Sequence, residues 1–130
     1  MKKVILLFSL IVFVSFNAQA QNSTKKMMET ETIKLEQVSG EFTQKQITVK
    51  EGAYIFEIAN NNVGHDVGFV LVPKGADISN PENHIQTAYV TQAVADGKSQ
   101  SSKLTVLEKG EYYYFCPLNP TATDNLLTVE

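Results

Sequence analysis

The stretch GEYYYFC, residues 110–116, decides the fold class, because it alternates like a β-strand and ends in the only cysteine of the chain. Alternate side chains of a strand share a face. One face therefore carries Tyr112, Tyr114 and Cys116. The turn residues Glu108-Lys109-Gly110 precede the stretch, and one loop separates it from a last apolar segment. We predict a strand that ends at a core-facing Cys116.

The same period of two recurs along most of the chain and predicts short strands separated by turn residues. A series of short strands with such turns is typical of a β-sandwich or a Greek-key barrel. The fold class that we expect is all-β, with about seven strands. The predicted strands are Thr32–Val38, Gln46–Val49, Tyr54–Ala59, Asp66–Val72, Leu104–Leu107, Tyr112–Cys116 and Leu126–Val129.

One segment departs from this pattern. The run Ser79-Asn80-Pro81-Glu82 has the spacing of a capping box with proline in the first turn. Ile85, Ala88 and Tyr89 then recur at helical intervals. We expect one short helix here that crosses between the sheets.

The N-terminus has the order of a secretory signal peptide. Lys2 and Lys3 precede the apolar run Val4–Phe16, and Ala18-Gln19-Ala20 follows as a cleavage site. We therefore predict a signal peptide at 1–20, a flexible leader at 21–31 and one domain at 32–130. The product is expected in the periplasm or outside the cell, as a monomer without a membrane anchor after cleavage.

The charge of the chain argues against nucleic acid as a partner. The formal net charge is −3 at pH 7, and the chain contains no arginine. Arginine is the usual bidentate contact to phosphate and base edges, and no basic stripe replaces it. Partners of other kinds, such as proteins, remain open.

The pattern of residues in this domain resembles the cupredoxin family of small blue copper proteins, with plastocyanin as an example. The resemblance covers about residues 32–130, and its most specific part is GEYYYFC followed by the final strand LLTVE. It implies a cupredoxin-like Greek-key fold with a copper site at the C-terminal strand end. The residues that carry it are Phe42, Ile47-Thr48-Val49, Gly52, Phe56, Asn60, His65, Gly110, Tyr112, Tyr114 and Cys116.

The resemblance implies Cys116 and His65 as copper ligands, but the rest of the usual ligand set is missing. A blue copper site uses a thiolate, two imidazoles and a weak axial ligand. The loop 117–125 contains neither histidine nor methionine. Asn119 stands where the pattern C-x-x-H would place the second imidazole. Its amide oxygen is a poor copper ligand, so we favour a hydrogen-bonding role for it and keep it only as a weak third ligand.

Three functions follow from these residues. The first is copper binding, as Cu(I) carriage or electron transfer, at a reduced site of Cys116 and His65, with a redox or copper-handling protein as partner. The second is a metal-free structural or protein-interaction module of the cell envelope, with Cys116 as a small buried hydrophobe.

The third function is an enzyme with Cys116 as nucleophile and His65 as base. We disfavour it because Asp66, as the strand neighbour of His65, would face the other side. The expectation is therefore that the protein is not an enzyme. His84, the other histidine, is interpreted as a surface residue of the predicted helix.

Overall fold

A computed structural model describes residues 30–130 of the chain, so the predicted signal peptide and nearly all of the predicted leader lie outside the described residues. Within 30–130, no helix is long and apolar enough to cross a membrane. The elements in chain order are β1 (Glu31–Val38), β2 (Glu41–Phe42), β3 (Gln46–Val49), β4 (Gly52–Asn60), β5 (Val70–Pro73), the 3-10 turns η1 (Pro81–Asn83) and η2 (Gln86–Ala88), β6 (Ser99–Ser101), β7 (Thr105–Leu107), β8 (Gly110–Phe115) and β9 (Asn125–Val129).

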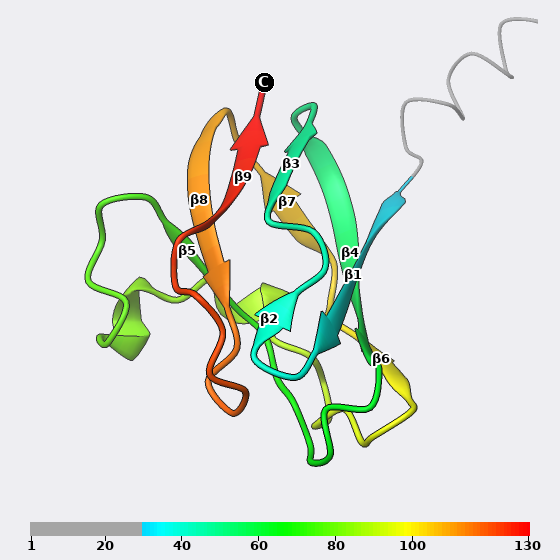
Figure 1. Cartoon of the computed structure of the whole chain (residues 1–130). Coiled ribbons are helices and arrows are strands. Elements are labelled where there is room, and N and C mark those ends of the chain that lie inside the picture. Colours follow the sequence, from blue (N-terminus) through cyan, green and yellow to red (C-terminus); the bar gives the residue numbers. More distant parts are fainter. Residues whose placement is uncertain (1–29) are drawn as a thin grey trace, which may run out of the picture.

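The strands form two sheets that face each other (Figure 1). The first sheet has the order β2-β1-β4-β6, and β7 also pairs with β4. The second has the order β3-β9-β8-β5. β1 runs parallel to β4, and β3 runs parallel to β9, whereas the other pairs are antiparallel. The predicted all-β sandwich is confirmed.

The core between the sheets is built on aromatic rings. Phe42, Phe56, Phe69 and Tyr114 are all at most 2% exposed. The rings of Phe42 and Tyr114 meet edge to face with their centroids 5.1 Å apart, and those of Phe56 and Phe69 are equally close. Edge-to-face and offset pairs are the favourable arrangements of aromatic rings. The inward face of β8 is the one predicted, because Tyr114 and Cys116 belong to this core.

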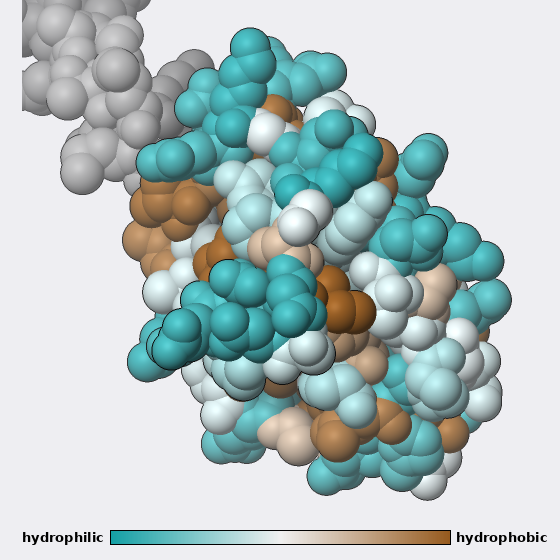
Figure 2. All heavy atoms as spheres, turned by 90° about the vertical axis from the view of Figure 1, so that its left-hand side faces the viewer, coloured by the Kyte–Doolittle hydropathy of each residue, from teal (hydrophilic) through white to brown (hydrophobic). Residues whose placement is uncertain are grey.

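A smaller apolar cluster lies on the outer face of the second sheet. Val70, Val72 and Phe115 are buried there against the partly buried Ile78 and Tyr89 of the segment 74–90. Figure 2 shows this side of the molecule, where hydrophobic residues form small patches among hydrophilic ones. The segment 74–90 therefore packs on the sheet through a limited apolar contact.

The predicted crossover helix is wrong in its details. The structure has two 3-10 turns in its place, and no α-helix occurs in residues 30–130. Asn80, rather than Ser79, caps the first turn by accepting from the Glu82 N–H. A longer helix does not form because the N–H of Ile85 donates to Leu71 O of β5 at 2.8 Å. This N–H is therefore not available for a hydrogen bond within a helix, and the helical pattern ends there.

The predicted strands differ from the structure mainly in their ends. The strand predicted at Asp66–Val72 begins only at Val70, and Val67 instead forms an isolated bridge with Val94. β2 and β6 were not predicted. They are two and three residues long, and β6 consists of polar residues only, so neither shows an alternating apolar pattern.

Candidate metal centre

β1, β4 and β8 all end at one end of the sandwich, which we call the pole (Figure 1). The loop after β4, residues 61–66, and the loop after β8, residues 117–124, both lie there. Asn62 and Gly64 have positive φ values of 55° and 96°, which lets the first loop turn sharply. The pole therefore gathers the residues that the sequence predicted as copper ligands.

Cys116 follows directly after β8 and is 6% exposed. Its Sγ accepts hydrogen bonds from three backbone N–H groups, those of Gly68 at 3.3 Å, Leu118 at 3.4 Å and Asn119 at 3.2 Å. Its own N–H donates to Thr121 Oγ1 at 3.2 Å. The sulfur is thus held by backbone from two segments of the pole.

His65 lies on the neighbouring loop and is exposed. Its Nδ1 is 2.8 Å from the carbonyl oxygen of Asp66, so Nδ1 carries the proton in this contact. Among residues 30–130, no hydrogen bond joins the imidazole to Cys116. The segment beside the thiol is instead Val67–Gly68, because the Gly68 N–H reaches Sγ and Val67 is fully buried in the same core cluster as Cys116.

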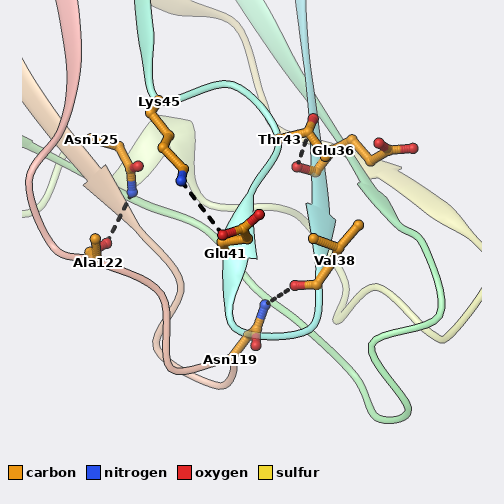
Figure 3. Close-up of polar contacts among 8 residues, drawn as sticks. All are labelled: Glu36, Val38, Glu41, Thr43, Lys45, Asn119, Ala122 and Asn125. Atoms are coloured by element: carbon orange, nitrogen blue, oxygen red, sulfur yellow. Dashed lines mark hydrogen bonds and ion pairs between the residues drawn. The ribbon is translucent and has the colours of Figure 1, made fainter.

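Asn119 is 1% exposed, and its side chain turns toward the connection between β1 and β2 (Figure 3). Its Oδ1 accepts from the Gly40 N–H at 2.9 Å. Its Nδ2 donates to Val38 O at 2.9 Å and to Gln37 Oε1 at 3.2 Å. The amide therefore has a hydrogen-bonding role, and its partners lie about 80 residues back along the chain rather than in its own turn.

His84 lies on the outer face of the second sheet, beside Phe115, and is partly buried rather than a simple surface residue. Its Nε2 is 2.8 Å from Ile78 O, and its Nδ1 is hydrogen-bonded to the Tyr89 hydroxyl. Its ring lies edge-on to Tyr89 and to Phe115, whose side chain faces away from the core that holds Cys116. His84 thus fixes the segment 74–90 to the outer face of the sheet.

Two buried amides at the pole were not singled out by sequence reasoning as site residues. Gln37 is fully buried on β1 and donates from Nε2 to Gly68 O at 2.8 Å. Asn60 is 2% exposed and holds its own loop, by accepting from the Val63 N–H and donating to the carbonyl oxygens of His65 and Val94. The signal for Gln37 was its place in the alternation of β1, where it follows Ile33 and Leu35 on the inward face.

These residues do not fit a blue copper centre. Such a centre needs two imidazoles beside the thiolate. In residues 30–130, no group of three or more His, Cys, Asp or Glu side chains could hold a metal ion. The side-chain amide of Asn119 is hydrogen-bonded to other protein groups. The residue before Gly68, whose N–H reaches the sulfur, is the apolar Val67 and not a histidine. The ligand roles of Cys116 and His65 stay predictions.

Comparisons with known proteins agree with the fold. The model of a family described as copper binding proteins, plastocyanin/azurin family, matches residues 28–124. No curated protein matches the sequence. The solved structure of auracyanin B is similar with a TM-score of 0.60 and 20% identity, over 77% of this chain and 88% of that one.

Two further solved structures have the same fold. The auracyanin of the photosynthetic bacterium Roseiflexus castenholzii has a TM-score of 0.57 and 17% identity, over 76% of this chain and 96% of that one. Auracyanin A, a "blue" copper protein of the green thermophilic photosynthetic bacterium Chloroflexus aurantiacus, has a TM-score of 0.57 and 18% identity, over 78% of this chain and 100% of that one. The predicted cupredoxin-like sandwich is confirmed.

Proposed function

This chain belongs to the plastocyanin/azurin family of copper-binding proteins, and we propose that it acts as a metal-free protein-interaction module of the cell envelope, with the cupredoxin fold as its scaffold. The family is one of copper proteins, so the proposal depends on what this chain has at the pole. The observation that carries it is Asn119, the residue in the C-x-x-H position.

The Asn119 amide cannot serve a metal without giving up its protein partners. All its hydrogen bonds go to β1 and the turn that follows, and its side chain is 1% exposed. A buried polar group that loses its partners costs about 1–3 kcal/mol. Coordination of copper by an amide oxygen would offset little of this cost, because copper prefers imidazole and thiolate ligands. Metal binding at this position is therefore unfavourable.

The proposed function also includes the location of the protein and the kind of partner that it binds. The order of charged, apolar and small residues in 1–20 supports export to the periplasm or the medium. The module works there as a monomer without catalytic activity, and its partner is a protein of the envelope. Residues 21–130 have nine Lys against fourteen Asp and Glu, and the resulting net charge of −5 favours a partner with a basic surface.

A second candidate is Cu(I) carriage by Cys116 with His65. It is favoured by one observation about the His65 ring. Among residues 30–130, Nδ1 has a hydrogen-bond partner and Nε2 has none, so Nε2 keeps an available electron pair. Cu(I) is soft and accepts few ligands, so a thiolate and one imidazole suit it better than they suit Cu(II). His65 would have to reach the sulfur from its exposed position.

The experiment is to load the protein, residues 21–130, separately with Cu(I) and Cu(II), and to measure bound metal by native mass spectrometry and visible absorption. The metal-free module predicts no stoichiometric binding of either ion by the folded protein. Tight Cu(I) binding without colour, lost in Cys116→Ser, would replace it with the second candidate. An intense blue Cu(II) form would contradict both and indicate electron transfer.

A further inference from the structure

Four residues at the pole form a closed ring of hydrogen bonds. Gln37 Nε2 donates to Gly68 O, and the Gly68 N–H donates to Cys116 Sγ. The same Sγ accepts from the Asn119 N–H, and Asn119 Nδ2 donates back to Gln37 Oε1. We call these four residues the amide circuit. It joins three segments that are far apart in sequence: the end of β1, the segment before β5 and the loop after β8.

The circuit is buried and complete. Gln37 is fully buried, and Asn119 and Cys116 are 1% and 6% exposed. In the part of the chain that the structure describes, no buried side-chain nitrogen or oxygen lacks a hydrogen-bond partner. A fully satisfied buried polar network is rigid, whereas a partly satisfied one is costly. The circuit therefore behaves as one unit, in which the loss of one bond weakens the others.

We propose that the amide circuit is a latch that holds the loop 117–124 closed over Cys116 in the absence of any metal. The Gln37 and Asn119 side chains form the cross-link between β1 and this loop, and the sulfur accepts the two backbone N–H bonds that complete the ring. Opening of the latch frees the loop locally and exposes the thiol, while the two sheets stay folded. This inference extends the proposed metal-free function but does not depend on what the protein binds.

The variant Gln37→Met tests the latch, because it keeps the length of the side chain and removes both of its hydrogen bonds. Without them, local opening should become at least about tenfold more frequent. The readout is the rate at which a bulky thiol reagent labels Cys116 under native conditions in the presence of a chelator. In such an assay the label reports transient opening of the structure.

The matched control is Asn60→Asp. Asn60 is also a buried amide at the pole, but its hydrogen bonds go to its own loop and to Val94, not to the circuit. Cys116 should be labelled at least about tenfold faster in Gln37→Met than in the parent, and no faster in Asn60→Asp than its global unfolding explains. Equal rates in Gln37→Met and the parent, or an acceleration in Gln37→Met no larger than its own global unfolding explains, would overturn the latch.

Hydrogen exchange of the parent protein tests the latch without any substitution. The backbone amides of Gly68 and Asn119 belong to one circuit, so they should exchange slowly and through a common opening event. Exchange of either at the rate of an exposed loop amide would overturn the proposal, even if Gln37→Met fails to fold. Copper binding by the parent would overturn the proposed function but leave this exchange result standing.

Discussion

Tyr114 offers a quantitative test of how β8, the strand before Cys116, is fixed. Its ring is fully buried against Phe42, and its hydroxyl donates to Gln44 O at 2.6 Å, across 70 positions of sequence. The substitution Tyr114→Phe keeps the ring and removes only this hydrogen bond. Because Gln44 O then loses a buried donor, the free energy of unfolding should fall by about 1–2 kcal/mol at neutral pH.

The pH dependence gives the same substitution a second, opposite effect. Burial raises the pKa of Tyr114 to about 12, from an ordinary value of 10.0. The folded state thus disfavours the ionised phenol. The stability that depends on a neutral Tyr114 is fully present below pH 10 and is lost as the pH rises through 12. A difference of two pKa units corresponds to a loss of about 2–3 kcal/mol in the parent. The Phe variant has no such loss.

The assay is urea unfolding of parent and Tyr114→Phe at fixed pH values from 8 to 12, with the difference in unfolding free energy as the readout. The variant should be the less stable protein at pH 8, the two should be equal near about pH 11, and the order should reverse above it. Tyr54, whose pKa is also raised by burial, is present in both and cancels. A difference that stays constant over this range would show that burial does not raise the pKa of Tyr114 in the folded protein.

Three more predictions concern the pole and the export of the chain. The double substitution Val67→His/Asn119→His puts one histidine on each of the two segments whose backbone N–H groups contact Sγ, and it should give a coloured Cu(II) complex that Asn119→His alone does not give; a folded but colourless double variant would show that these two positions do not present their side chains to the sulfur. Cys116 should not cross-link two chains, because it is 6% exposed, and a prompt covalent dimer on non-reducing gels would contradict this. Cell fractionation should recover a soluble form that begins near Gln21, whereas full-length protein in the cytoplasm would refute export.

The architecture could be predicted because it depends on local alternation. β3 was predicted with its exact ends, and Tyr54, Phe56 and Ile58 of β4 are buried on one face as expected. The helix prediction failed because the competing partner of Ile85 is a strand carbonyl that no local pattern reveals. Local rules thus find strands well but do not detect tertiary hydrogen bonds that replace helical ones.

The site was harder to predict, because its contacts join distant segments. Cys116 and Asn119 could be picked out by the resemblance and its C-x-x-H spacing, but the side chain of Asn119 bonds Gln37, Val38 and Gly40, which lie 79–82 positions away. His65 was assigned to the thiol because the resemblance to the cupredoxin family implies a histidine ligand in this loop. The structure brings the Gly68 amide to the sulfur instead, because the chain between Asn60 and β5 is irregular and its register cannot be counted as in a strand.

We propose that the pole of this protein works without a metal. The most direct measurement is the metal content of the processed protein, purified from its own cells without chelators and quantified against protein concentration. If the pole holds no metal, copper should be far below one ion per chain, and the Gly68 and Asn119 amides should exchange slowly in that same sample. One copper per chain, removed by Cys116→Ser, would contradict it.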